Sequence, residues 1–285
     1  MTALDLRPIG DSNIDIAVSM LMRGFPDHEP DFWPQGLERI RSLHEPGRHG
    51  PIGYLMTVGG EFAGIILTIP SSRDDADGRA DVVHLAAWYM EEPHRWLAAR
   101  MMKMVVAAAG TVFFDLTPNP AATAISRRLG FDVLDEGVLV YLLPVTALRF
   151  GGEAEVWSFE RAEHRMRPAD AKLLRQHRAL GCIVGALRVG EAFSPIIFTR
   201  SQRRGISGAR LIRADSKKLV TDNLGAISRF LLRQNLLFLR MNARRNDSVA
   251  GSLIARWNKP TFIKGPRSSA EVDLTYSEFV FLGIS

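Results

Sequence analysis

The chain alternates between short apolar runs and polar turns, and the spacing of its apolar positions switches repeatedly between the helical and the strand period. The first part of the chain is predicted to contain a strand at 3–7, helices at 14–24 and 32–43, and a hairpin of strands at 54–58 and 62–69. A polar loop at 71–81 then leads to a buried strand at 82–90 and to a helix of about four turns that begins near Arg95. A strand at 111–116, a short helix that ends at Gly130 and a strand at 138–143 follow. The elements between 82 and 116 form one βαβ unit. Its first turn, at Glu91-Glu92-Pro93, offers a helix N-terminus to an anion.

The second half repeats this order of elements. Residues 190–199 are similar to 60–68, and both stretches follow an apolar strand and precede a polar loop, a strand, a helix and another strand. Residues 167–180 parallel the opening of the chain in the same way. The sequence therefore predicts a first domain over 1–148, a connection over 149–166 and a more divergent second domain over 167–285, with its last strand at 275–284.

Length and composition limit the classes of protein that fit. With 285 residues, 46% of them hydrophobic, the chain can bury one large core or two of ordinary domain size. Its one cysteine, Cys182, excludes an internal disulfide framework and suits a reducing compartment. We see no secretory signal and no uncharged run of about 20 residues that would span a bilayer, so we expect a cytoplasmic protein.

Charge is distributed unevenly along the chain. Residues 1–150 carry 13 Lys and Arg against 19 Asp and Glu, whereas residues 151–285 carry 23 against 12. The basic half could attract an anionic ligand, or it could complement the acidic half across an interface. Nucleic acid is not the expected partner, because aromatic residues are not interleaved with the arginine clusters.

The segment 81–131 resembles the middle of the GNAT superfamily of acyl-CoA-dependent N-acyltransferases. The resemblance rests on the strand-end turn at Met90-Glu91-Glu92-Pro93, on the loop that starts at Arg95, on Asn119 and on the closing pair Gly130-Phe131. It implies an α/β (α+β) fold of two GNAT-like domains, each with a mixed, mostly antiparallel twisted sheet flanked by helices. Within the loop, the positions that match the family's two glycines are Ala98 and Arg100.

The resemblance also implies a set of site residues. The cofactor would be acetyl-CoA or another acyl-CoA, with no metal, bound by strand backbone, by the pyrophosphate loop and by the turn after the second strand. These positions are Trp88, Tyr89, Met90, Arg95, Trp96, Leu97, Ala98, Ala99, Arg100, Asn119 and Ala122. The candidate general bases are His84 and Glu91, and Ser126, at the family's tyrosine position, or water would protonate the leaving thiolate.

Two functions fit these patterns. The first is transfer of an acyl group, acetyl by expectation, from acyl-CoA to an amine or hydroxyl of an unidentified acceptor, with Asp27, His28, Glu29 and Trp33 as residues that could face an amine. The alternative is a catalytically inactive GNAT-like module that binds an anionic ligand or a protein partner, because the loop lacks both glycines and Ser126 replaces the tyrosine. Whether the chain forms a homodimer is left open.

Overall fold

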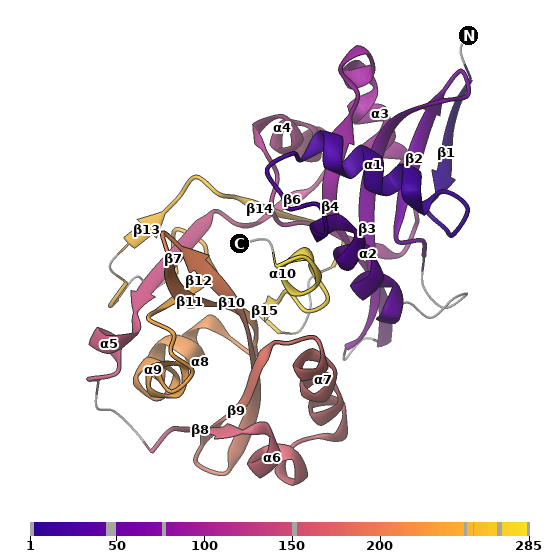
Figure 1. The fold of residues 1–285 in the computed structure, drawn as a ribbon. Coiled ribbons are helices and arrows are strands. Elements are labelled where there is room, and N and C mark those ends of the chain that lie inside the picture. The colour runs from indigo at the N-terminus through magenta and orange to yellow at the C-terminus, as the bar shows by residue number, and fades with distance from the viewer. Residues whose placement is uncertain are drawn as a thin grey trace. The chain divides into compact units, whose positions relative to one another are not determined.

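The computed structural model describes residues 3–43, 50–75, 78–149, 153–247, 250–252, 254–266 and 270–283. The chain divides into two compact units. The first comprises Met1–Leu134 and Thr261–Arg267, and the second comprises Asp135–Pro260 and Ser268–Ser285. Each unit is built on one twisted sheet with helices packed against it (Figure 1).

The first unit contains a seven-stranded sheet in which only the pairing of β4 with β5 is known to be parallel. Its strands, in spatial order, are β1 (Leu4–Pro8), β2 (Gly53–Val58), β3 (Glu61–Asp75), β4 (Gly78–Met90), β5 (Thr111–Asp115), β14 (Thr261–Lys264) and β6 (Asp132–Asp135). Helix α1 (Ile14–Gly24) lies against β3 and β4, and α2 (Phe32–Leu43) follows it (Figure 1). The 3₁₀ helix η1 (Glu92–Leu97), α3 (Ala98–Val105) and α4 (Pro120–Arg128) connect the strands that follow β4.

An apolar core joins α3 and α4 to the sheet. Met101, Met102 and Val105 of α3 pack with Phe113 of β5 and with Phe262 of β14. Phe262 has no exposed surface, so burial of this side chain fixes β14 beside β5 even though the two strands are far apart in the sequence.

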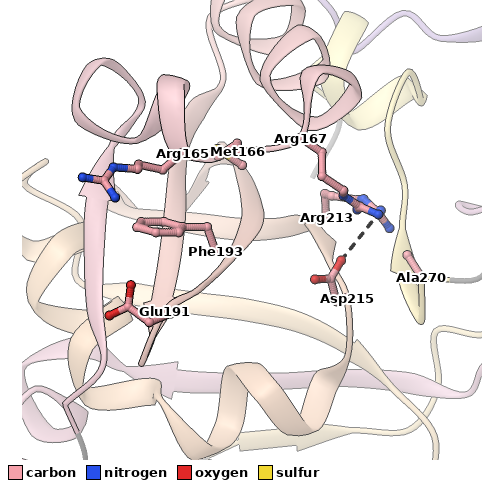
Figure 2. Close-up of a pocket in the computed structure, with 8 residues that line it drawn as sticks. All are labelled: Arg165, Met166, Arg167, Glu191, Phe193, Arg213, Asp215 and Ala270. Carbon is pink, nitrogen blue, oxygen red and sulfur yellow. Dashed lines mark ion pairs between the residues drawn. The ribbon is translucent and has the colours of Figure 1, made fainter.

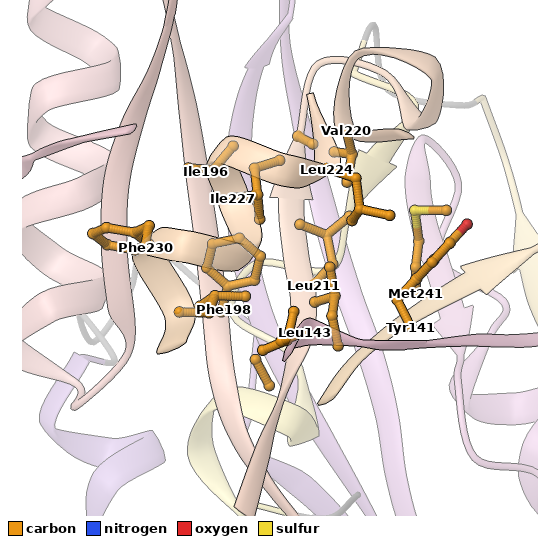
Figure 3. Packing of buried hydrophobic residues seen from close by; sticks show 14 of the residues in the cluster. Tyr141, Leu143, Ile196, Phe198, Leu211, Val220, Leu224, Ile227, Phe230 and Met241 are labelled. Carbon is orange, nitrogen blue, oxygen red and sulfur yellow. The ribbon is translucent and has the colours of Figure 1, made fainter. Parts of the chain in front are cut away.

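The second unit contains an eight-stranded sheet. Its strands, in spatial order, are β13 (Ile254–Arg256), β7 (Gly137–Leu142), β12 (Phe238–Ala243), β11 (Ile206–Ala214), β10 (Ala192–Arg203), β9 (Ile183–Val189) and β8 (Glu155–Ser158), and β15 (Val272–Asp273) pairs with β11. Its helices are α5 (Leu143–Thr146), α6 (Phe159–Ala162), η2 (Glu163–Arg165), α7 (Pro168–Ala179), α8 (Lys217–Asp222), α9 (Leu224–Leu232) and α10 (Glu278–Phe281). Figure 3 shows how Val220, Leu224, Ile227 and Phe230 of α8 and α9 cover Phe198 and its neighbours on the sheet.

The structure confirms a mixed α/β fold with two mixed sheets flanked by helices, and it corrects several of the predicted elements. The predicted strand at 138–143 forms as β7, but it pairs with β12 in the second sheet and does not close the first domain. The unit boundaries accordingly differ from the predicted limits at 148 and 167. Alternation identifies a strand but does not identify its neighbour, so the sequence could not show this exchange.

Three local predictions were also wrong. Within the predicted polar loop at 71–81, the described residues 71–75 and 78–81 continue the hairpin of β3 and β4, and cross-strand pairing such as that of Ser71 with Val82 overrides their polar character. The helix of about four turns near Arg95 is a 3₁₀ helix followed by the eight-residue α3. The predicted strand at 275–284 contains the short helix α10, whose residues are all buried, and a short buried apolar run does not distinguish strand from helix.

Candidate active site

The strands β4 and β5 separate at their carboxyl ends. Their parallel pairing runs from Asp81 opposite Thr111 to Leu85 opposite Asp115, where β5 ends. β4 continues through residues 86–90, and no other strand in the described parts of the chain pairs with it on that side. Because β5 ends first, residues 86–90 of β4 have no strand beside them on that side in the described parts of the chain, and an extended ligand can add to such a length of main chain as a strand does.

A β-bulge lies within this same stretch of β4. Gly64 and Ile65 of β3 pair with Met90 and Tyr89, but Leu67 pairs with Ala86, so that two residues of β4 lie opposite one residue of β3. Ala87 takes a left-handed conformation with φ of 44°.

The bulge reverses the predicted alternation of side chains beyond it. Strict alternation from His84 would place Trp88 and Met90 on its face of the strand, but both contribute to the core that contains Leu85 and α3. An extra residue in a strand shifts every later side chain to the opposite face, which explains the difference.

Glu91 lies directly after β4 and is held by two other side chains. The Tyr89 hydroxyl donates a hydrogen bond of 3.0 Å to Oε2 of Glu91, and the guanidinium of Arg23, from the end of α1, lies 3.1 Å from Oε1. Burial, and then the neighbouring Glu91 carboxylate, raises the pKa of Tyr89, so the phenol keeps its proton and remains a donor. The Glu91 side chain is 27% exposed, although its Oε1 atom is buried.

The close approach of α1 to this end of β4 depends on Gly24. A Cβ atom at Gly24 would lie 2.4 Å from the Tyr89 ring, nearer than side chains approach one another. Gly24 therefore allows the end of α1, with Arg23, to reach Glu91.

The turn between α1 and α2 carries an aromatic cluster. The exposed His28 ring stacks on Phe32 with a centroid distance of 3.9 Å, and both rings meet the edge of Trp33. Trp33 is 1% exposed, so it anchors α2 and does not face an acceptor. Asp27 and Glu29 are exposed beside His28, as an amine-facing surface requires.

His84 and Ser126, two of the three predicted catalytic residues, lie in the core. His84 has no exposed surface, and its ring stacks on Phe114 at 4.9 Å. Ser126 is also fully buried, and its hydroxyl donates a 2.9 Å hydrogen bond to Asp115. Neither side chain is accessible to a ligand in this structure.

Asp115 is a titratable residue of this region that the sequence did not single out. It ends β5 where β4 and β5 separate, and it is 6% exposed. Burial raises its pKa to about 6, and the hydrogen bond from Ser126 opposes that shift. An acidic residue at the end of an apolar strand is the only sequence signal that would have identified it.

The predicted pyrophosphate loop is more helical than expected. Within η1, the N–H of His94 donates to the carbonyl of Glu91 and the N–H of Ala98 donates to that of Arg95. Arg95, Trp96, Ala99 and Arg100 are exposed, whereas Leu97 lies in the core. The loop therefore presents cationic side chains but has used two of its backbone donors.

Asn119 caps α4. Its side-chain oxygen accepts a 2.8 Å hydrogen bond from the N–H of Ala122, which is 8% exposed. The structure thus brings Asn119 and Ala122 together, and it explains the asparagine at this position as the N-cap of α4.

In the second unit, the corresponding separation of strands is occupied by the chain itself. β11 is parallel to β12 at Ala209 and Arg210, and beyond that point β15 pairs antiparallel with β11. The N–H of Leu274 donates a hydrogen bond of 2.8 Å to the carbonyl of Ile212, so the contact between β11 and this segment continues beyond β15.

Lys217, at the start of α8, is held by two carboxylates. It is 7% exposed, and its ammonium donates to Asp135 at 2.6 Å and to Asp247 at 2.7 Å. Lys218 is exposed and pairs with Asp222. The second unit thus retains the fold but fills the position that a strand-like ligand would take.

Within the described residues, no group of three His, Cys, Asp or Glu side chains is arranged to hold a metal ion. No helix among these residues has the length and apolar character that crossing a membrane requires.

Solved structures of other proteins share this arrangement of strands and helices. A GCN5-related N-acetyltransferase from Anabaena variabilis matches with a TM-score of 0.57 and 13% identity, over 92% of this chain and 72% of that chain. A putative acetyltransferase from Pyrococcus horikoshii matches with a TM-score of 0.55 and 11% identity, over 96% and 93%. A tandem GNAT protein from the clavulanic acid biosynthesis pathway matches with a TM-score of 0.51 and 10% identity, over 93% of this chain and all of that chain. No protein-family profile and no curated protein sequence matches the chain.

These similarities define the fold of the chain as that of the GNAT N-acetyltransferases. The chain contains this fold as a tandem pair, as the resemblance at 81–131 implied.

Proposed function

We propose that the protein transfers an acyl group from acyl-CoA to an amine or hydroxyl of an acceptor, and that the first unit performs the reaction. The observation that carries this proposal is that β4 continues through residues 86–90 beyond the end of β5, with no strand on that side among the described residues. Main-chain groups in such a stretch can hold the pantetheine arm of an acyl-CoA as an added strand. The second unit contributes no second cofactor site of this kind, because β15 occupies the equivalent position.

The residues around this stretch fit an acyl-CoA in part. The backbone of Trp88, Tyr89 and Met90 would hold the pantetheine, and the exposed Arg95 and Arg100 would pair with the phosphates. Acyl-CoA supplies an activated thioester carbonyl to the bound acceptor. Placing both reactants side by side converts a bimolecular reaction into one within a complex, which accounts for most of the acceleration.

Glu91 is the proposed general base. Its carboxylate is partly exposed, and Tyr89 and Arg23 fix its orientation. It would take the proton that the acceptor nitrogen or oxygen loses as that atom attacks the thioester carbon. The electron pair of the broken carbon–sulfur bond leaves with sulfur, and water protonates the thiolate, because the Ser126 proton is directed to Asp115.

The inactive module is the second candidate function, and the structure of the turn after β4 favours it. Two amides of this turn bond to carbonyls within η1, so fewer backbone donors are available for a pyrophosphate. In that case the same surface would bind an anion or a partner without turnover.

Acyl transfer can be tested by following release of free thiol from acetyl-CoA with a panel of amines and alcohols. Glu91→Gln should lower kcat by about 100-fold or more, the contribution expected of a general base, while leaving the affinity for acetyl-CoA unchanged. Glu38→Gln, an exposed glutamate on α2, is the matched control and should behave as wild type. Absence of thiol release with every acceptor, or equal turnover of Glu91→Gln and wild type, would reject this mechanism.

A further inference from the structure

A cavity in the second unit lies where the start of α7 meets β10 and β11. Its volume is about 520 Å³, sufficient for a small organic molecule. Figure 2 shows Arg165 and Arg167 from the segment before α7, Phe193 from β10, and Arg213 with Asp215 from the end of β11. All of these residues belong to one unit.

Arg213 carries the main physical argument. Its side chain is only 11% exposed, and its Nε and Nη1 atoms are buried without a hydrogen-bond partner among the described residues. Its Nη2 lies 3.8 Å from Asp215, a loose ion pair. Buried guanidinium donors without partners are costly, so this arginine lacks the acceptors that its position requires.

The two other arginines of the cavity have different roles. Arg167 donates from Nε and Nη2 to Asp170 at 2.7 and 3.2 Å, which fixes the plane of its guanidinium. Arg165 is exposed, and no ion pair involves it among the residues that the structure describes. The Arg167 guanidinium is therefore oriented in advance, whereas the Arg165 guanidinium points away from Arg213, on the far side of Phe193 (Figure 2).

Acidic residues offset part of the positive charge at the cavity, because Arg167 pairs with Asp170 and Arg213 lies near Asp215. The Glu191 side chain is 93% exposed and pairs with Arg188, outside the group of three arginines. Asp215 makes the one close acidic contact to Arg213. The unit as a whole carries 22 Lys and Arg against 14 Asp and Glu, so its field favours anions.

We propose that this cavity binds a small organic oxyanion, with Arg167 and Arg213 holding a carboxylate or phosphate group and the Phe193 ring packing against the apolar part of the ligand (Figure 2). Guanidinium groups match the geometry of both oxyanions. Phe193 is half-buried and contacts Trp157 with a centroid distance of 5.1 Å, which holds its ring in place. The site is independent of acyl transfer, which we assign to the first unit.

Isothermal titration calorimetry of the full chain, without acyl-CoA, tests this site with inorganic phosphate, phenyl phosphate and benzoate as probes. Phenyl phosphate should bind about tenfold tighter than inorganic phosphate, and Phe193→Ala should remove that advantage. Benzoate separates a carboxylate site from a phosphate site, since only the preferred oxyanion should bind measurably.

Arg213→Gln should weaken binding of the preferred probe at least about tenfold. Arg167→Gln, at a side chain that is 75% exposed, should weaken it by a similar factor and keeps the test valid if Arg213→Gln fails to fold. Arg200→Gln, at an exposed position on β10, is the control and should bind as wild type.

No binding of any probe up to about 10 mM, or binding that survives both Arg167→Gln and Arg213→Gln, would overturn the proposal. Acyl transfer by Arg167→Gln should equal that of wild type. Failure of this site and failure of the proposed enzyme activity are therefore distinguishable.

Discussion

The buried carboxyl group of Asp115 makes the stability of the first unit depend on pH. Its pKa is raised from 3.8 to about 6 by burial, with Ser126 as its hydrogen-bond donor. Between these values the folded chain binds more protons than the unfolded chain, so the free energy of unfolding falls as pH rises through this range. Below pH 3.8 both states are protonated and the full stability is present.

The size of the effect follows from the shift. A change from 3.8 to about 6 corresponds to about 3 kcal/mol, at about 1.4 kcal/mol for each pKa unit. Asp115→Asn removes the ionisation but keeps an acceptor for Ser126. The variant should therefore be more stable than wild type by up to about 3 kcal/mol at about pH 8, with little difference at about pH 4.

Urea unfolding of wild type and Asp115→Asn across this pH range measures the difference in their free energies of unfolding. The Asp115 carboxyl ¹³C resonance, identified by its absence from the variant, reports the titration of this group in wild type. Asp132→Asn, at an exposed position on β6, serves as the control: it retains Asp115, so its stability should follow that of wild type across the range. A stability difference between Asp115→Asn and wild type that is the same at both ends of the range would refute the reasoning.

Three further predictions concern buried or capping side chains. Lys217→Met should cost about 3–5 kcal/mol in urea unfolding because it leaves two buried carboxylates without their cation, whereas Lys218→Met at an exposed pair should cost less than about 1 kcal/mol. Asn119→Ala should lower the stability by about 1 kcal/mol while Asn119→Ser restores most of it, and equal effects of the two substitutions would show that the side chain does not act as a cap. Phe279→Ala should cost about 3–5 kcal/mol, since the ring is 3% exposed and lies 4.2 Å from the Arg210 guanidinium; a loss below about 1 kcal/mol would mean that α10 is not part of the core.

Sequence patterns were sufficient for the elements whose period is uninterrupted. The predicted helix at 14–24 corresponds to α1, and the Gly59-Gly60 turn joins β2 and β3, because these segments combine clear periodicity with residues suited to their caps or turns. The internal repeat indicated the tandem fold for the same reason. Order of elements is a property that a divergent sequence retains.

The sequence was not sufficient where the structure depends on contacts between distant segments. The pairing of Arg23 with Glu91 joins residues far apart in the chain, and the bulge at Ala87 leaves no mark in an apolar strand. The exchange of β7 and β14 between the two sheets likewise depends on packing, and period alone does not encode it.

Burial also limits what residue type alone can predict about the site. His84 has suitable chemistry for a base and a plausible position, yet it lies in the core, whereas Glu91 lies at the surface beside two oriented partners. His84 and Glu91 both carry titratable groups, and only the burial seen in the structure shows which of the two a ligand could reach.

Hydrogen exchange of the main chain at residues 86–90, with and without acetyl-CoA, tests the central claim most directly. Binding along the unpaired side of β4 should slow exchange there and leave β11, which β15 already covers, unchanged. Unchanged exchange at 86–90 under saturating acetyl-CoA would contradict the account.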